Sequence, residues 1–214
     1  MVSHVELSGL RARFYDQLIL IGTLGLYNPL IHTIIADMQI KPADKILDMG
    51  AGTGKNTLLM RRYLSDDGHI TACEISTGMK KQFQKKCGKY KNITLSSFRI
   101  ERPLPFRDTF DKVFLSFVIH GFTHDQRISI LQNALNALKP GGRLFIFDWN
   151  EFSLEQSGPL LRLFMNTLNA SWRGILSGGT SPAYSSRADL GMLKDISMHG
   201  EKFVFCLRQN SAVP

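Results

Sequence analysis

An acidic residue and three alternating glycines form a short segment whose spacing is typical of a ligand-binding turn. The segment ILDMGAGTGKNT, residues 46–57, places Asp48 two residues before Gly50, and Gly52 and Gly54 follow. Glycine reaches backbone conformations that other residues avoid, so such a turn can bring its backbone close to a bound molecule. Two nucleotide-binding motifs look similar, and their spacing can be tested against this segment.

Neither motif fits. A phosphate-binding P-loop that uses Lys55 as its lysine requires a glycine at position 49 and a serine or threonine at position 56, where the chain has Met49 and Asn56. The dinucleotide fingerprint GxGxxG requires its third glycine at position 55, which is the lysine. Because Lys55 then has no phosphate to bind, we expect its side chain to point to solvent.

The segments around the turn predict an α/β fold. Short apolar runs are predicted to be strands and are separated by helical patterns; these runs are residues 45–49, 69–74, 92–98, 110–119 and 141–149. One helix is expected to bury a stripe made of Ile128, Leu131, Leu135 and Leu138. Strands this apolar are not expected to expose either face of the sheet to solvent. This indicates a Rossmann-like, doubly wound, mostly parallel sheet with helices on both faces. Ligands of such sheets bind at the carboxyl ends of the strands.

The basic charge of the chain has two interpretations. The formal net charge is +8, and seven of the basic residues lie between residues 75 and 100, where Glu74 precedes them and no acid occurs. The segment can be a patch that binds nucleic acid or anionic lipid. It can also be the solvent face of a helix that buries Met79, Phe83 and Cys87, and this second interpretation is favoured because these three residues recur every four positions.

Cysteine use and the N-terminal sequence favour a cytoplasmic protein. Cys73, Cys87 and Cys206 are odd in number and far apart, without the spacing of metal ligands, so no metal site is expected. The N-terminal residues lack the pattern of a signal peptide. Residues 18–36 carry no formal charge over nearly the length that spans a bilayer. The triplet Tyr27-Asn28-Pro29 favours two shorter helices, as a cap over the site or a surface that contacts membrane, over a transmembrane helix.

Four segments together resemble the class I S-adenosylmethionine-dependent methyltransferases. They are ILDMGAGTGKNT, ITACEIS, PLPFRDTFDKVFLSFVIHGF and LKPGGRLFIFDW, and the resemblance covers residues 44–149. The branch that is most similar includes the ubiquinone and menaquinone C-methyltransferases and the bacterial phospholipid N-methyltransferases. We interpret residues 1–214 as one methyltransferase domain, with an N-terminal helical cap (1–43), a cofactor-binding core (44–149) and a substrate-side helix, loop and last strand (150–214).

The resemblance implies a site for S-adenosyl-L-methionine. It places Gly50, Ala51, Gly52 and Gly54 against the methionine part, where the helix that follows can donate N–H groups to its carboxylate. It places Asp48 near the cationic groups and Glu74 at the ribose hydroxyls. The other cofactor-binding residues that it implies are Tyr15, Ile75, Met79, Ser116 and Phe117, of which Tyr15 closes over the cofactor or packs a helix.

The chain departs from the family at the adenine. The family pattern GDIEKPLPF has an acid that accepts the adenine amino group, whereas this chain reads FRIERPLPF and has Arg99 in its place. Adenine recognition is therefore expected to use the backbone near Ile100 or a neighbouring residue. His120, which follows the fourth strand, is the candidate catalytic residue, with packing or capping as the alternative role.

We expect methyl transfer to a small, hydrophobic or lipid-like acceptor, either a quinone precursor or a phospholipid amine. Tyr184 and Arg187 are the nearest candidates for a quinone-binding pair, within the segment 174–187 that is either a connector or a lid. The basic surface fits peripheral contact with anionic lipid at the inner membrane face. Nucleic-acid methylation is disfavoured because the amino-directed motif [DN]PP[YF] and a Pro-Cys nucleophile pair are absent. Methylation of RNA through the basic patch and cofactor binding without activity are the remaining alternatives.

Overall fold

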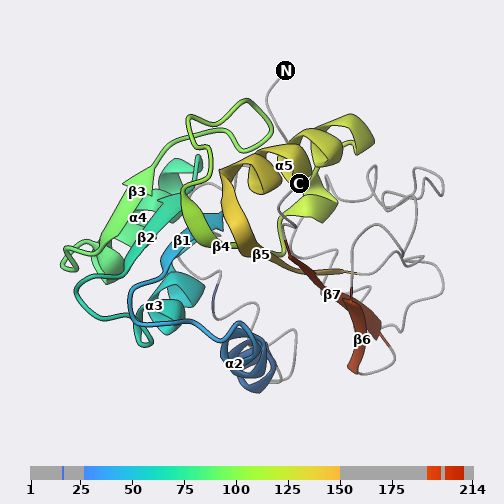
Figure 1. Ribbon diagram of the computed structural model, residues 1–214, viewed down its shortest axis with the longest axis horizontal. Helices are drawn as coiled ribbons and strands as arrows, with labels where there is room; N and C mark the ends of the chain where they lie inside the picture. Colours follow the sequence, from blue (N-terminus) through green and yellow to red (C-terminus); the bar gives the residue numbers. More distant parts are fainter. Residues whose placement is uncertain (1–15, 17–26, 150–191, 199–200, 210–214) are drawn as a thin grey trace.

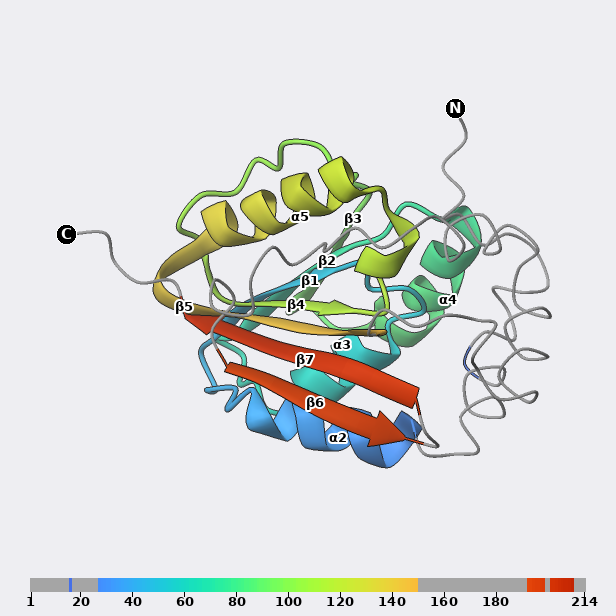
Figure 2. The same ribbon diagram turned by 90° about the vertical axis from the view of Figure 1, so that its right-hand side faces the viewer.

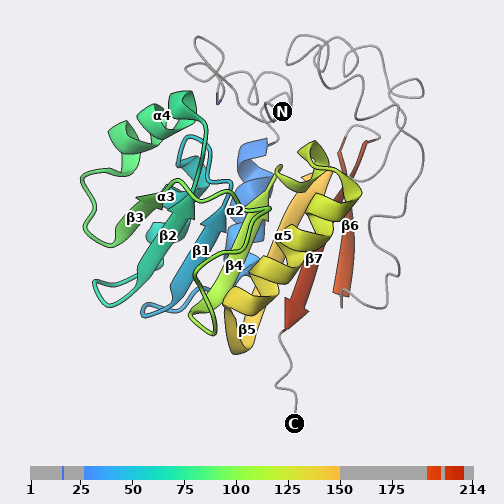
Figure 3. The same ribbon diagram turned by 90° about the horizontal axis from the view of Figure 1, so that it is seen from above.

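The computed structural model describes residues 16, 27–149, 192–198 and 201–209. A seven-stranded sheet with the order β3-β2-β1-β4-β5-β7-β6 forms its centre (Figures 1 and 3). The strands are β1 (Lys45–Met49), β2 (His69–Cys73), β3 (Ile93–Ser96), β4 (Phe110–Ser116), β5 (Leu138–Trp149), β6 (Met192–Met198) and β7 (Glu201–Gln209). The helices are α2 (Tyr27–Asp37), α3 (Lys55–Arg61), α4 (Thr77–Cys87), α5 (His124–Ala137) and the 3-10 helix η1 (Ile119–Gly121).

The sheet is mostly parallel, as expected. The four neighbouring pairs from β3 to β5 are all parallel, whereas β7 pairs antiparallel with both β5 and β6. The expected last strand at residues 201–209 is confirmed as β7. The strand β6 was not expected, because the segment MLKDISM lies beyond the alternation that identified the others. With the parallel strands aligned, the carboxyl ends of β1 to β4 meet at one edge of the sheet.

Helices cover both faces of the sheet (Figure 2). On one face, α5 packs on a cluster that includes Leu47 and Leu115, and on the other α2 and α3 pack on a cluster that includes Ile46 and Phe114. Adjacent residues of one strand therefore face opposite layers, as the pleat requires. The doubly wound architecture predicted from the apolar strands is confirmed.

The helix α4 has the buried face that its spacing predicts. Met79, Phe83 and Cys87 are buried, and Phe83 and Cys87 form a small cluster with Ala72 of β2. Four lysines of the basic segment are exposed and two are partly buried; the exposed ones are Lys81, Lys85, Lys89 and Lys91. This arrangement agrees with the interpretation of the segment as a solvent-facing helix surface.

The buried stripe predicted for α5 is wrong at one position. Ile128 is 41% exposed, and the fully buried residues of the helix are Ile130, Ala134 and Ala137. The small alanine side chains allow the helix to approach the sheet closely, so the helix turns this face inward. Leu131 and Leu135 are partly buried beside the same core, and Leu138 belongs to β5. A pattern that counts only large apolar residues misses a face made of alanines.

The helix α2 spans Tyr27–Asp37, and because residues 17–26 lie outside the described ranges, the break at Tyr27-Asn28-Pro29 stays a prediction. Pro29 lies in its first turn, where its missing N–H costs no hydrogen bond. Ile31, Ile34 and Ile35 are buried against the sheet. The helix has 11 residues, and none of the helices in the described ranges combines the length and the apolar character needed to cross a bilayer.

Candidate functional site

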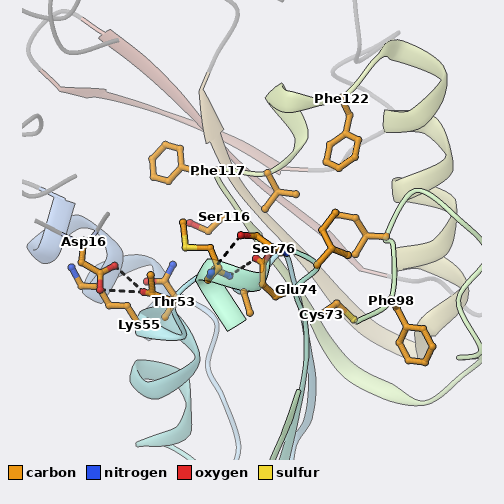
Figure 4. Close-up of a pocket in the computed structure, with 18 of the residues that line it drawn as sticks. Asp16, Thr53, Lys55, Cys73, Glu74, Ser76, Phe98, Ser116, Phe117 and Phe122 are labelled. Carbon is orange, nitrogen blue, oxygen red and sulfur yellow. Dashed lines mark hydrogen bonds between the residues drawn. The ribbon is translucent and has the colours of Figure 1, made fainter. Parts of the chain in front are cut away.

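A cavity opens at the carboxyl ends of β1, β2 and β4, beside the loop that follows β3 (Figure 4). Its empty volume is about 1010 Å³, including solvent at its open mouth. The residues that line it are Asp16, Tyr27, Gly50, Ala51, Gly52, Thr53, Lys55, Asn56, Cys73, Glu74, Ile75, Ser76, Met79, Phe98, Ile100, Glu101, Ser116, Phe117, Val118 and Phe122. Its lining combines apolar side chains with a few polar groups, which is typical of a site for a small ligand or cofactor.

The glycine turn between β1 and α3 is built on left-handed backbone. Gly50, Gly52 and Gly54 have φ angles of 79°, 56° and 81°. The N–H groups of Gly50 and Ala51 donate to the carbonyl oxygen of Cys73 at 2.9 and 3.0 Å, which ties the turn to the end of β2. A Cβ at Gly52 would meet no atom within 4 Å, because this residue borders the open cavity. The turn thus presents backbone rather than side chains to a ligand.

Gly54 has a structural role instead. It caps α3, and a Cβ there would lie 2.8 Å from Phe83 Cδ2 and 2.6 Å from Cys87 Sγ. It does not contribute to the lining of the cavity. The glycine at this position permits α3 and α4 to pack closely.

Glu74 is held by backbone groups at the end of β2. Its Oε2 accepts a hydrogen bond from Gly52 N at 2.9 Å, and its Oε1 accepts one from Ser76 N at 2.7 Å (Figure 4). Burial raises the pKa of Glu74, and these backbone hydrogen bonds act against that rise. Each oxygen retains a further lone pair. The carboxylate is therefore oriented to accept hydrogen bonds from a pair of ligand hydroxyl groups.

Asp48 lies beneath the site rather than in its wall. It is 2% exposed, does not line the cavity, and accepts a hydrogen bond from Thr57 Oγ1 at 2.6 Å. Burial raises its pKa to about 7, the hydroxyl of Thr57 lowers it, and the charge of Glu74 raises it further. Asp48 can act on a bound cation only through its field, and a cation nearby would favour its ionised form.

The expectation that Lys55 points to solvent is wrong. Its ammonium group donates to Asn28 Oδ1 at 2.6 Å and lies 4.9 Å from the centre of the Tyr27 ring. Burial lowers its pKa. Tyr27 also exchanges hydrogen bonds with Asn56, so α2 and the first turn of α3 are joined by polar contacts at the edge of the cavity. The solvent expectation failed because it considered the first turn of α3 without α2 beside it.

Asp16 lies at the same edge. Its carboxylate accepts a hydrogen bond from Thr53 Oγ1 at 2.9 Å and forms an ion pair with Lys86 of α4. The Lys86 ammonium group also donates a hydrogen bond to Thr53 Oγ1 at 2.9 Å. Figure 4 shows Asp16, Thr53 and Lys55 together on one side of the cavity. This side is polar and charged.

Ser116 and Phe117 border the cavity where β4 ends. Phe117 has a φ of 55°, a conformation that costs a non-glycine residue free energy, and its N–H donates to Phe147 O at 2.8 Å. The buried carboxylate of Asp148 accepts hydrogen bonds from Val118 N at 3.0 Å and Ile119 N at 2.7 Å. These contacts hold the loop beside the cavity. They also explain why β4 ends at Ser116 rather than at residue 119, as the sequence had suggested.

The loop after β3 contains the predicted departure from the family pattern. Arg99 does not line the cavity, and its Nε donates to Glu101 Oε1 at 2.7 Å. Glu101, Ile100 and Phe98 do line it. An acid is therefore present at the cavity, two positions beyond the one expected.

The cavity brings together nine of the predicted cofactor-binding residues, namely Gly50, Ala51, Gly52, Glu74, Ile75, Met79, Ile100, Ser116 and Phe117. Asp48, Gly54 and Arg99 lie outside its lining. Tyr15, Tyr184 and Arg187 lie outside the described residues, as do the predicted helix 159–172 and the segment 174–187. His120 lies in η1, and its proposed catalytic role stays a prediction.

Sequence reasoning missed several residues of the cavity wall, chiefly Asp16, Tyr27, Thr53, Asn56, Phe98, Glu101 and Phe122. Glu101 had a signal, since it lies in the same segment as Arg99 and is the nearest acid. Asp16 had one as well, since it follows Tyr15, which was expected to close over the cofactor, whereas Tyr27 had none. Among the residues that the structure describes, no three His, Cys, Asp or Glu side chains are close enough to bind a metal ion together.

Comparison with known proteins agrees with this site. Residues 46–142 match a family model described as a methyltransferase domain. The chain is 30% identical over 141 residues to a ubiquinone/menaquinone biosynthesis C-methyltransferase of Wigglesworthia glossinidia brevipalpis, covering 64% of this chain and 55% of that protein. It is 28% identical over 168 residues to a demethylmenaquinone methyltransferase of Symbiobacterium thermophilum, covering 77% and 63%. The chain thus spans between about half and two thirds of the length of these relatives.

Solved structures share the fold. An S-adenosylmethionine-dependent methyltransferase from Aquifex aeolicus superimposes with a TM-score of 0.57 at 19% identity, covering 83% of this chain and 88% of that one. The [4+2]-cyclase SpnF superimposes with a TM-score of 0.57 at 14% identity, covering 86% and 81%. At such identities the likeness concerns the fold, and the cyclase is a reminder that this fold supports more than one kind of chemistry.

Proposed function

We propose that this protein, whose core is a methyltransferase domain of the class I, S-adenosylmethionine-dependent type, transfers a methyl group from S-adenosyl-L-methionine to a small, hydrophobic acceptor. The observation that carries the proposal is the glycine turn joined to Glu74. The turn leaves its backbone open to the cavity, and the carboxylate beside it accepts hydrogen bonds from Gly52 and Ser76. This arrangement fits an amino-acid group and a ribose in adjacent positions.

The residues present fit the cofactor along its length. Glu74 would accept hydrogen bonds from the ribose hydroxyls, and the backbone of the glycine turn would contact the methionine part. Ile75 and Met79 would pack against the adenine, and Ser116 and Phe117 would border the cofactor on the β4 side. Asp48, with a pKa raised to about 7, would become ionised when a cation lies above it.

The cofactor supplies an electrophilic methyl group on a sulfonium, and the protein positions an acceptor in line with it. Such transfer depends mainly on alignment and on the exclusion of water. Phe117 has a constrained position in the cavity lining, since its strained backbone donates a hydrogen bond to Phe147 and its ring centre lies 5.8 Å from that of Tyr27. His120, in the loop held by Asp148, is the candidate for proton transfer, which the alignment mechanism does not require.

The names of the relatives favour a quinone precursor as the acceptor. One of the two relatives described above is named for ubiquinone/menaquinone biosynthesis, and the other is named for demethylmenaquinone. The aromatic side chains of Phe98, Phe117 and Phe122 at the cavity are compatible with a flat, apolar acceptor. A phospholipid amine at the surface of an anionic membrane remains the second acceptor class, in line with the net charge of +8. A cytoplasmic protein that contacts the inner membrane face would meet either acceptor.

The test has two steps. Calorimetry with S-adenosylmethionine comes first, and absence of binding at millimolar cofactor would overturn the proposal. The protein is then incubated with cofactor labelled at the methyl group and with separate quinone-precursor, phospholipid and RNA fractions. We expect label in the quinone fraction. Label in the RNA fraction alone, with steep loss of binding as salt rises, would replace the proposal by RNA methylation.

One variant tests the role of Glu74. Glu74→Gln keeps the size of the side chain and removes the charge that holds two backbone N–H groups and the ribose, so we expect at least a tenfold loss of cofactor affinity, roughly 1.4 kcal/mol.

A further inference from the structure

The helix α4 and the residues just after β3 form a basic surface. We call the four lysines of α4 and the arginine after β3 the basic rim; they are Lys80, Lys81, Lys85, Lys86 and Arg99. A solvent-facing position accounts for the exposure of Lys81 and Lys85, but not for the absence of any acid in residues 75–100. These two lysines are four residues apart on one helix, where like charges repel, and neither forms an ion pair within the described part of the chain. An anionic surface bound there would relieve that repulsion.

The basic rim lies along the edge of the cavity. Lys80 Nζ donates a hydrogen bond to Ser97 Oγ at 2.9 Å, and the next residue, Phe98, lines the cavity. Lys86 Nζ donates to Thr53 Oγ1, which also belongs to the lining. Figure 4 shows Thr53 and Phe98 at opposite sides of the cavity. The helix α4 therefore borders the cavity from one side to the other.

An exposed aromatic ring adds an apolar element beside these charges. Phe98 is 38% exposed, although its ring packs edge-on against that of Phe106 with ring centres 5.7 Å apart. The other exposed large apolar side chains of the described ranges, Tyr63 and Ile128, do not line the cavity. Aromatic rings favour the interface between a bilayer and water, and lysines near them are attracted to anionic lipid.

The charges within the cavity favour lipid over nucleic acid as the partner of this surface. The carboxylates of Asp16, Glu74 and Glu101 line the cavity. A nucleic-acid strand that inserted a base would bring its phosphates close to these carboxylates, and like charges repel at short range. A lipid surface keeps its phosphates at the basic rim, and only an apolar molecule has to enter the cavity.

We propose that the basic rim and Phe98 dock on an anionic lipid surface, so that the cavity opens toward the bilayer and receives its apolar acceptor from it. The docking stands on this surface alone, whereas the delivery of an acceptor rests on the proposed function. The attraction between exposed charges is screened by salt, so the docking is reversible and weakens as ionic strength rises.

Co-sedimentation with vesicles tests the docking. The full chain is mixed with vesicles of phosphatidylcholine alone, or of phosphatidylcholine and phosphatidylglycerol together. We expect at least about tenfold tighter binding to the anionic vesicles, and loss of this preference at high salt. Equal binding to both kinds of vesicle, or binding to neither, overturns the docking.

Two double variants with the same change in net charge test whether the basic rim is the surface that docks. Lys81→Glu with Lys85→Glu reverses two charges of the rim. Lys41→Glu with Lys45→Glu reverses two exposed charges at the amino end of β1, away from the cavity. The rim variant should bind anionic vesicles at least about tenfold more weakly than the control variant. Equal losses would show that net charge alone attracts the protein, and would overturn the proposal.

A second pair tests the aromatic ring. Phe98→Ser should weaken binding to anionic vesicles several-fold, whereas Tyr63→Ser should leave it unchanged, although Tyr63 is the more exposed at 43%. Tyr63 lies between α3 and the amino end of β2, away from the cavity. Equal binding by the two variants overturns the role of Phe98. Circular dichroism and thermal melting establish that every variant is folded.

Two further measurements separate this proposal from its alternatives. Polyuridylate replaces the vesicles in a parallel assay, and binding of polyuridylate without binding of vesicles would overturn the lipid surface in favour of RNA. Calorimetry with S-adenosylhomocysteine should give the same affinity for the rim variant as for the wild type. A protein that binds this ligand but no vesicle overturns the docking and leaves the proposed function standing, and vesicle binding without ligand binding does the reverse.

Discussion

Gly52→Ala separates the effect of the glycine turn on binding from its effect on stability. The added Cβ would meet no protein atom within 4 Å, so no side chain has to move in the free protein. Its φ of 56° is unfavourable for alanine, which costs about 1–2 kcal/mol. The N–H that donates to Glu74 is retained. We therefore expect a modest loss of stability.

The effect on binding should be larger than this strain explains. Gly52 lines the cavity, so the methyl group takes space where the turn is expected to contact the cofactor. Displacing the cofactor from the backbone and from Glu74 should weaken binding at least tenfold, which corresponds to roughly 1.4 kcal/mol or more. Urea unfolding measures the loss of stability, and calorimetry with S-adenosylhomocysteine measures the loss of affinity.

Gly141→Ala is the matched control. Gly141 also has a left-handed backbone, with φ of 79°, and a Cβ there would likewise meet no atom within 4 Å, but it does not line the cavity. It should lose about the same stability, roughly 1–2 kcal/mol, and none of the affinity. The reasoning is refuted if the two variants bind the cofactor equally well, or if Gly52→Ala loses affinity only in proportion to its lost stability.

Three further predictions concern buried groups. Asp48→Asn should stabilise the protein at pH 8 but not near pH 4. The reason is that the pKa of Asp48 is raised from 3.8 to about 7 in the folded protein, so its ionisation destabilises the folded state as pH rises through this range. The difference in unfolding free energy is roughly 4 kcal/mol at most, and urea unfolding at both pH values measures it. Ile130→Ala should cost about 2–5 kcal/mol, whereas Ile128→Ala should stay within about 0.5 kcal/mol, and equal effects in urea unfolding would contradict the assigned buried face of α5. Lys112→Met should cost about 3–5 kcal/mol by leaving Asp44 charged and buried, and adding Asp44→Asn should recover part of that loss, as thermal melting of the double variant will show.

The loop after β3 shows where sequence comparison with a family stops. Position 99 carries arginine where the family pattern has an acid, so adenine recognition was expected to use the backbone near Ile100 or a neighbouring residue. In the folded chain Arg99 pairs with Glu101, and it is Glu101 that borders the cavity. A comparison of positions one by one does not show that Glu101 rather than residue 99 borders the cavity, because this depends on the direction that each side chain takes in an irregular loop.

Lys55 and Asp48 illustrate the same limit within the best-defined motif. The spacing of ILDMGAGTGKNT excluded a phosphate loop from residue types alone. It did not show that Lys55 contacts Asn28 of α2, or that Asp48 is enclosed below the cavity with Thr57. The first fact depends on the helix that packs beside the motif, and the second on how the motif itself folds between β1 and α3.

The sequence by itself determined the alternation of strands and helices, the mostly parallel sheet with both faces covered, and the position of the glycine turn. These follow from apolar runs, helical spacing and the backbone freedom of glycine, which are properties of neighbouring residues. Only the tertiary structure decided which side chains line the cavity, that α5 buries alanines rather than Ile128, and that Glu101 and Asp16 reach the site. The physical reason is that burial and hydrogen bonding depend on contacts between segments far apart in the chain, such as that of Asp16 with Lys86. Local sequence patterns do not show which distant segments will make such contacts.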